Sequence, residues 1–289
     1  MNPGVIALKE CLMQLALVND ECVEAFPGGR GVCPICGMEM IAKCGPRIVH
    51  HWAHHRPRDC DPWWENETQW HRDWKNLFPI ECREVSHTAA DGEIHRADIK
   101  TPTGIIIEIQ HSSMTDAERQ SRENFYGNLV WVVDGSVFRK NFDIYHGLPD
   151  PKSELARDLV WFKAKRHMLG GTAGMFYRLS ENPGTKKGVT DDRMVEVHSI
   201  RKIQDEVDDT YCGHHQYDWV RPRATWLDAK CPVYIDFGGD KLARLETYDE
   251  SGLPCIRHVA KRKFVHDTMV ETNATDIASH FYPLPKNVQ

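Results

Sequence analysis

The sequence has no long apolar run, no secretory leader pattern and no excess of positive charge. Its longest apolar stretch is the short GIIIEI region, far below the roughly 20 residues of a membrane-spanning helix. The N-terminus lacks the basic, apolar and small-residue order of a secretory signal. The formal net charge of −6 argues against a nonspecific basic coat for nucleic acid. We therefore expect a cytoplasmic protein without a membrane partner.

Paired cysteines are also scarce. The 289 residues hold 10 cysteines, but only Cys33 and Cys36 stand at the spacing of metal ligands. In a cytoplasmic chain this pattern favours a metal site over disulfides. There is no internal repeat and no low-complexity tract. A hydrophobic share of 41% with 27% charged residues is ordinary globular composition, and the length suits two or three domains.

The order of the predicted elements indicates an α/β (α+β) protein in three parts. We expect an N-terminal segment with a Cys/His cluster, a central core and a C-terminal accessory domain, at residues 1–62, 63–150 and 151–289. Apolar patterns predict a core of helix, three strands, helix and strand, which makes a mixed sheet. The core elements are expected at 63–78, 80–87, 93–100, 105–111, 115–126 and 129–134. Outside the core, a helix is expected at 5–18, with a strand as the alternative at its start. A second helix is expected at 152–169, and short strands from 231 onward.

A predicted hairpin brings two acids face to face. Pro102 and Gly104 suit a three-residue loop whose last residue is left-handed. That loop sets Asp98 directly opposite Glu108, and alternation places Gln110 on the same face. Opposed carboxylates repel, so a cation between them would explain the arrangement. Hard ions such as Mg²⁺ or Mn²⁺ prefer these oxygen ligands and can activate a water for attack on a phosphodiester.

The first core helix adds a third acid. Glu67 falls within the apolar stripe of the predicted helix, beside His71 and Trp74, and a buried acid is costly unless it is paired. Local readings remain open for each acid. Glu108 could face solvent, Asp98 could pair with Arg96 or Lys100, and Glu67 could pair with His71 or Arg72.

At these residues the sequence resembles the competence protein CoiA-like nucleases, a branch of the PD-(D/E)XK nuclease superfamily. The likeness lies in ENETQWHRDWK, HRADI and IEIQHS, at residues 65–75, 95–99 and 107–112. It implies a restriction-endonuclease-like core in which Asp98 and Glu108 bind the catalytic metal. Gln110 would stand where the superfamily more often has lysine, and Glu67 and His71 would be the helix-borne acid and its neighbour.

The Cys33-x2-Cys36 pair is followed by His51-Trp52-Ala53-His54, and two thiolates with two imidazoles would close a structural zinc site. The family likeness favours His51 and His54 as the imidazole ligands. Four other residues are near enough in sequence to substitute: His50, His55, Cys44 and Cys60. Cys212, His214, His215 and Cys231 hint at a second metal cluster, but they include no further pair at the spacing of metal ligands.

The sequence thus predicts a Mg²⁺-dependent (or Mn²⁺-dependent) nuclease with a structural Zn²⁺, acting on nucleic acid, above all DNA. The alternative is a catalytically inactive zinc-containing module that binds nucleic acid or protein, encoded by a phage or mobile element. The sequence names no protein partner and is compatible with a homo-oligomer. Strandedness, the direction of cleavage and the work of residues 151–289 stay open.

Overall fold

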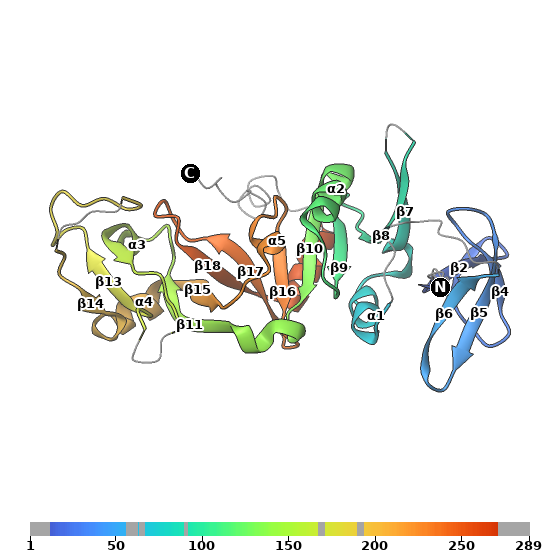
Figure 1. Ribbon diagram of the computed structural model, residues 1–289, viewed down its shortest axis with the longest axis horizontal. Coiled ribbons are helices and arrows are strands. Elements are labelled where there is room, and N and C mark those ends of the chain that lie inside the picture. The colour runs from blue at the N-terminus through green and yellow to red at the C-terminus, as the bar shows by residue number, and fades with distance from the viewer. Residues whose placement is uncertain are drawn as a thin grey trace, which may run out of the picture. The chain divides into compact units, whose positions relative to one another are not determined.

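The computed structural model describes residues 12–55, 63, 67–89, 92–166, 171–189 and 194–270. The described chain forms two compact units, and their boundary falls inside strand β10 (Leu129–Asp134). Unit 1 takes the described residues up to Trp131 together with 267–270, and unit 2 takes those from Val132 to His266. Helices and sheets occur together in both units (Figure 1), as the predicted α/β (α+β) class requires. The three-part division at 62 and 150 stays a prediction.

Unit 1 begins with a six-stranded sheet in the order β1-β6-β5-β4-β2-β3. Its strands are β1 (Leu12–Met13), β2 (Leu15–Val18), β3 (Glu21–Glu24), β4 (Arg30–Val32), β5 (Glu39–Gly45) and β6 (Ile48–His54). Met13, Ala16, Met40 and Trp52 form its small core.

The helix predicted at 5–18 is wrong over the described residues, because residues 12–18 are strands. Asn19 and Asp20 both have positive φ, 53° and 65°, and they join β2 to β3 as a two-residue hairpin in which Val18 pairs with Glu21. That turn, with pairing to β3 and β4, outweighs the helix propensity of the Leu- and Ala-rich segment.

The rest of unit 1 has the predicted order of helix, three strands, helix and strand. These elements are α1 (Gln69–Lys75), β7 (Arg83–Thr88), β8 (Ile94–Lys100), β9 (Ile106–Gln110), α2 (Asp116–Tyr126) and β10. A short 3₁₀ turn, η1 (Ile80–Cys82), precedes β7. Within this unit the strands lie in the order β10-β9-β8-β7, so α2 links two neighbouring strands.

Helix α1 is shorter than the predicted 63–78. Thr68 is its extended N-cap, and His71 at the third helical position completes a capping box, so the helix begins at Gln69. Glu67 therefore precedes the helix and does not share its apolar stripe. Leu77, which falls within the predicted helix, lies beyond the C-cap and is exposed.

Unit 2 contains an antiparallel sheet in the order β11-β15-β18-β17-β16, and a three-stranded sheet in the order β12-β13-β14. The strands of the larger sheet are β11 (Phe142–Pro149), β15 (Tyr211–Trp219), β16 (Val233–Asp236), β17 (Lys241–Thr247) and β18 (Pro254–Ala260). The smaller sheet has β12 (Leu159–Trp161), β13 (Met175–Arg178) and β14 (His198–Ser199). The remaining elements are η2 (Ser136–Asn141), α3 (Glu154–Asp158), η3 (Ile200–Lys202), α4 (Gln204–Thr210), α5 (Ala224–Leu227) and α6 (Lys261–Met269).

The long helix predicted at 152–169 is confirmed only over α3, and the described residues 159–166 are not helical. Helix α3 ends at Asp158, and Leu159-Val160-Trp161 pairs with β13 as a strand. Pairing and burial of this apolar run in the core around Phe176 outweigh its local helical pattern. The strands expected at PVYIDF and LARLETY are found as β16 and β17.

Candidate active site and metal centre

The β8–β9 hairpin has the predicted register. Ile99 pairs with Ile107 and Lys100 with Ile106, so Asp98 stands opposite Glu108. The backbone N–H of Gly104 donates to the carbonyl of Thr101 at 2.9 Å, and Gly104 has φ +81°, the left-handed conformation that glycine adopts without strain.

Side chains replace backbone pairing at the next position of the hairpin. The N–H of Asp98 donates to Oε1 of Glu108 at 3.2 Å, and the N–H of Ile109 donates to Oδ2 of Asp98 at 2.9 Å. Each carboxylate therefore reaches across to the opposite strand. At this position of the hairpin, hydrogen bonds from backbone N–H groups to the two carboxylates take the place of backbone-to-backbone hydrogen bonds.

Lys75, at the end of α1, lies among three carboxylates. Its Nζ is 3.1 Å from Oδ1 of Asp98, 2.9 Å from Oε1 of Glu67 and 3.0 Å from Oε1 of Glu84. The Lys75 side chain is 5% exposed. Burial alone would lower its pKa, but the three acids raise the pKa overall, so the amine stays protonated. The ammonium group of Lys75 thus supplies positive charge beside Asp98, where the sequence predicts a metal ion.

Glu108 has a cation of its own. Nη1 of Arg122, on α2, donates to Oε2 of Glu108 at 3.0 Å, and its Nη2 donates to Glu118 at 2.7 Å. Because Arg122 also pairs with Glu118, it does not fully neutralise the charge of Glu108. Burial and the charge of Asp98 raise the pKa of Glu108 to about 8, against the lowering effect of Arg122. Asp98 shows the opposite result: burial raises its pKa, but Lys75, His71 and the Ile109 N–H bring it below the usual value.

Glu67 and His71 both lie at this site, in different roles. Oε2 of Glu67 accepts a hydrogen bond from Nε of Arg72 at 2.9 Å, while its Oε1 meets Lys75. The pairing with Arg72 is one of the local readings that the sequence left open. His71 caps its own helix, since its Nδ1 accepts a bond from the N–H of Thr68 at 3.2 Å. Its effect on Asp98 is electrostatic.

Gln110 is buried at the end of β9, and its Nε2 donates to the carbonyl of Ser112 at 3.3 Å. An amide cannot supply positive charge at this position. The positive charge of the site comes from elsewhere in the sequence, from Lys75 and Arg122.

Sequence reasoning missed Lys75, Glu84 and Arg122. Lys75 carried a signal, because it follows His71 at four-residue spacing in the predicted helix and a helical turn brings such residues together. Glu84 carried none, because its place depends on the tertiary fold. It has φ +52°, and its carboxylate accepts the backbone N–H groups of Gln14 and Leu15 at 3.1 and 3.0 Å.

The residues of the hairpin fit a hard divalent cation. Asp98 and Glu108 supply oxygen donors, and Mg²⁺ commonly binds through one or two carboxylates with retained waters. Each of their four oxygens meets one donor, from Lys75, Ile109, Asp98 or Arg122, which leaves a second lone pair on every oxygen. The raised pKa of Glu108 marks the carboxyl whose charge is least compensated.

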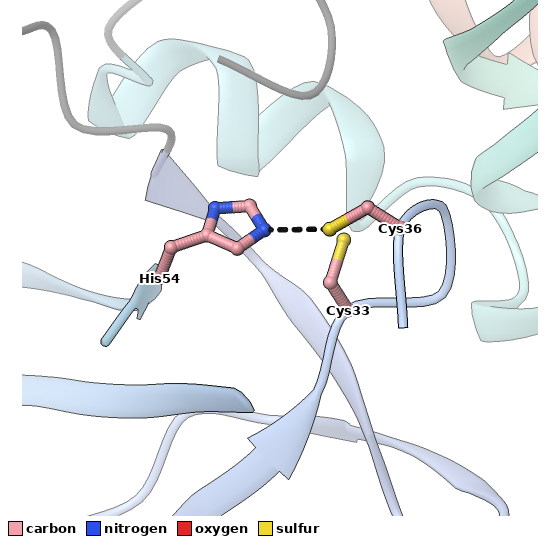
Figure 2. A group of neighbouring side chains, drawn as sticks. All are labelled: Cys33, Cys36 and His54. Carbon is pink, nitrogen blue, oxygen red and sulfur yellow. Dashed lines mark hydrogen bonds between the residues drawn. The ribbon is translucent and has the colours of Figure 1, made fainter. Parts of the chain in front are cut away.

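A second group of ligand-type residues forms in the N-terminal sheet. Ligand atoms of Cys33, Cys36 and His54 all lie within 4.8 Å of one another, and Sγ of Cys36 is 3.2 Å from Nε2 of His54. Figure 2 shows the two thiols at the turn after β4 and the imidazole reaching them from β6. Gly37, with φ +68°, closes that turn by donating its N–H to the Cys33 carbonyl at 2.9 Å. The group could bind a metal such as zinc, for which thiolate and imidazole are the usual ligands.

The structure does not bring His51 into this group. Its Nδ1 contacts the carbonyl of Val49 at 2.7 Å. His51 and His54 are three residues apart on strand β6, and alternation places such residues on opposite faces. The prediction that both histidines bind zinc did not take into account a strand at these residues. Of the other candidates, His50, His55 and Cys44 are not among the clustered residues, and Cys60 lies outside the described residues.

Comparisons with known protein families, with curated proteins and with solved structures found no match for this chain. The resemblance to CoiA-like nucleases thus rests on the motif residues alone. In the described parts of the chain, no helix combines the length and the hydropathy needed to cross a bilayer.

Proposed function

We propose that this chain is a divalent-metal-dependent nuclease of the CoiA-like type that cleaves DNA in the cytoplasm. The observation that carries the proposal is the opposition of Asp98 and Glu108 across the β8–β9 hairpin, with Lys75 at Asp98. The predicted order of core elements supports it, and so does the oxygen donor set. A bound Mg²⁺ or Mn²⁺ would activate water and stabilise charge on the phosphate.

The residues divide the remaining work. Asp98, with its lowered pKa, stays ionised and holds the cation. Glu108 titrates near neutral pH, so it can hold or release a proton there. Lys75 cannot act as a base because its pKa is raised, and its ammonium group orients Asp98 and Glu67. Gln110, whose Nε2 donates to Ser112, would hold the segment after β9 in place.

Cys33, Cys36 and His54 would hold a structural zinc that stabilises the small N-terminal sheet. A fold with so small a core commonly depends on such a ligand set.

The test is cleavage of labelled single-stranded DNA, double-stranded DNA and RNA by the full chain, with Mg²⁺, with Mn²⁺ or without either. We expect metal-dependent cleavage of DNA that is lost in Asp98→Asn. Asp73→Asn, which changes an exposed acid on α1, is the matched control and should cleave normally. Cleavage that survives Asp98→Asn would overturn the assignment. Binding without cleavage would support the inactive binding module, which the neutralisation of Asp98 by Lys75 favours.

A further inference from the structure

Unit 2 contains a cavity of about 500 Å³ between β15, β17, β18 and the segment after α5. This volume falls within the usual range for small-ligand sites. Four basic side chains line it: Lys152, Lys230, Arg244 and Arg257. Trp226 and Tyr248 add apolar wall.

Two of the basic residues are set against each other. Arg244 on β17 pairs in register with Arg257 on β18, and like charges directly opposite on neighbouring strands repel. A sequence keeps such a pair more readily when an anion joins them. Glu246 supplies one: its Oε1 lies 3.0 Å from Nε of Arg244 and 3.0 Å from Nη2 of Arg257. One carboxylate compensates one of these two charges.

Arg244 has donor capacity left over. Its side chain is 5% exposed, and among the described residues no acceptor meets its buried Nη1. A buried guanidinium N–H without an acceptor is costly, and a ligand oxygen would satisfy it. The guanidinium also lies over the ring of Tyr234, with Cζ 5.7 Å from the ring centroid, which holds it in one orientation.

Two of the three acids that line the cavity are already paired with basic side chains. Asp249 is engaged by Lys187 at 2.7 Å, and Glu246 also meets His214 at 3.2 Å. Asp150 accepts the N–H of Lys152 at 2.9 Å. Lys152 and Lys230 also line the cavity, and both are exposed.

A cation fits this place less well, although ligand atoms of His214, Glu246 and Cys255 lie within 4.8 Å of one another. Both arginines lie against Glu246, and burial raises the pKa of the Cys255 thiol well above its usual value. A divalent ion would have to displace these arginines and a proton.

We infer that this cavity binds a phosphate monoester, the terminal phosphate of a nucleotide, through Arg244, Arg257 and the two exposed lysines. Arginine favours phosphate because its planar fork presents two parallel donors. Trp226 and Tyr248 supply the aromatic wall for the attached nucleoside. The phosphate can come from a free nucleotide or from the 5′-phosphorylated end of a strand.

The test is isothermal titration calorimetry on the full chain without added Mg²⁺ or Mn²⁺, with dAMP, deoxyadenosine and inorganic phosphate. We expect dAMP to bind and deoxyadenosine to fail. Titrations of short oligonucleotides with a 5′-phosphate or a 5′-hydroxyl, made with Asp98→Asn so that no strand is cut, distinguish the two sources. Tighter binding of the 5′-phosphorylated strand than of dAMP identifies a strand end, and the reverse order identifies a free nucleotide.

Variants locate the binding. Arg244→Gln should weaken dAMP binding at least about tenfold, as the loss of a charge-assisted bond predicts. Since Arg244 is buried, the double variant Lys152→Gln/Lys230→Gln gives an independent test at exposed positions and should weaken binding by a similar factor. Arg201→Gln, an exposed arginine outside the cavity, is the control. Equal affinity for dAMP and deoxyadenosine, no binding of either, or full affinity in the lysine double variant would overturn the inference.

Discussion

Nζ of Lys75 lies 3.1 Å from Oδ1 of Asp98, and it holds Glu67 and Glu84 at comparable distances. One buried ammonium group thereby joins the segment before α1, the start of β7 and the β8–β9 hairpin. Removing a buried charge leaves its partners uncompensated, and this costs about 3–5 kcal/mol.

We therefore expect Lys75→Met to lower the free energy of unfolding by about this amount and to abolish cleavage. Lys75→Arg, which retains the charge, should recover part of the stability. Urea titration followed by circular dichroism measures both. Lys186→Met, at an exposed lysine, is the control and should change little. An unchanged midpoint for Lys75→Met would show that the three acids do not depend on it.

A second prediction concerns Glu108, whose folded pKa of about 8 exceeds its ordinary value of 4.5. The folded state thus binds a proton more tightly than the unfolded state. Stability of the metal-free protein therefore falls as pH rises from about 4.5 toward 8. Glu108→Gln removes this loss, because the amide carries no charge.

Thermal unfolding without Mg²⁺ or Mn²⁺ at several pH values between 6 and 9 measures the effect. We expect the melting temperature of Glu108→Gln to exceed that of the wild type by a few degrees, and the difference to grow with pH up to about 8. Glu21→Gln, at an exposed acid of β3, should show no such trend. A difference between Glu108→Gln and the wild type that is constant with pH would mean that Glu108 has an ordinary pKa.

The β8–β9 hairpin shows what the sequence could determine. Pro102 and Gly104 fix the loop locally, and a two-residue side-chain period then sets Asp98 opposite Glu108 without any tertiary information. The partners of these acids could not be obtained in that way. Arg122 comes from a helix after the hairpin, and Glu84 depends on a strained backbone position.

The Cys/His segment shows a different limit. Cys33 and Cys36 are neighbours within one turn, so their spacing was informative by itself. The choice between His51 and His54 depended on whether residues 48–54 form a strand, and the segment has no clear alternation of apolar residues. Tertiary pairing with β5 and β1 decided that question.

These two histidines provide the third prediction. His54→Ala should lose most of the bound zinc, whereas His51→Ala should retain it. His54 lies beside the thiols of Cys33 and Cys36, and His51 does not. Metal analysis of the purified proteins by mass spectrometry gives the zinc content directly. Loss of zinc in His51→Ala to the same extent as in His54→Ala would restore the ligand set predicted from the family likeness.

The fourth prediction tests the contact between the N-terminal sheet and the core. Glu84 accepts the N–H groups of Gln14 and Leu15 and pairs with Lys75. Burial raises the pKa of Glu84, but Lys75, Arg96 and the two backbone N–H groups lower it to about 2. Its folded pKa is thus depressed, so its stabilising effect is complete above about 4.5 and is lost as pH falls toward 2.

Glu84→Gln removes the charge that compensates Lys75 and leaves one acceptor oxygen for the two N–H groups, so we expect a loss of about 3 kcal/mol near neutral pH. The difference from the wild type should shrink as pH is lowered from 6 to 3, where the wild-type carboxylate begins to lose its advantage. Urea unfolding across this range measures it, with Glu81→Gln at an exposed neighbouring acid as control. If the difference instead stayed constant down to pH 3, the loss would reflect altered packing, and the ionised carboxylate would not be what links the two sheets.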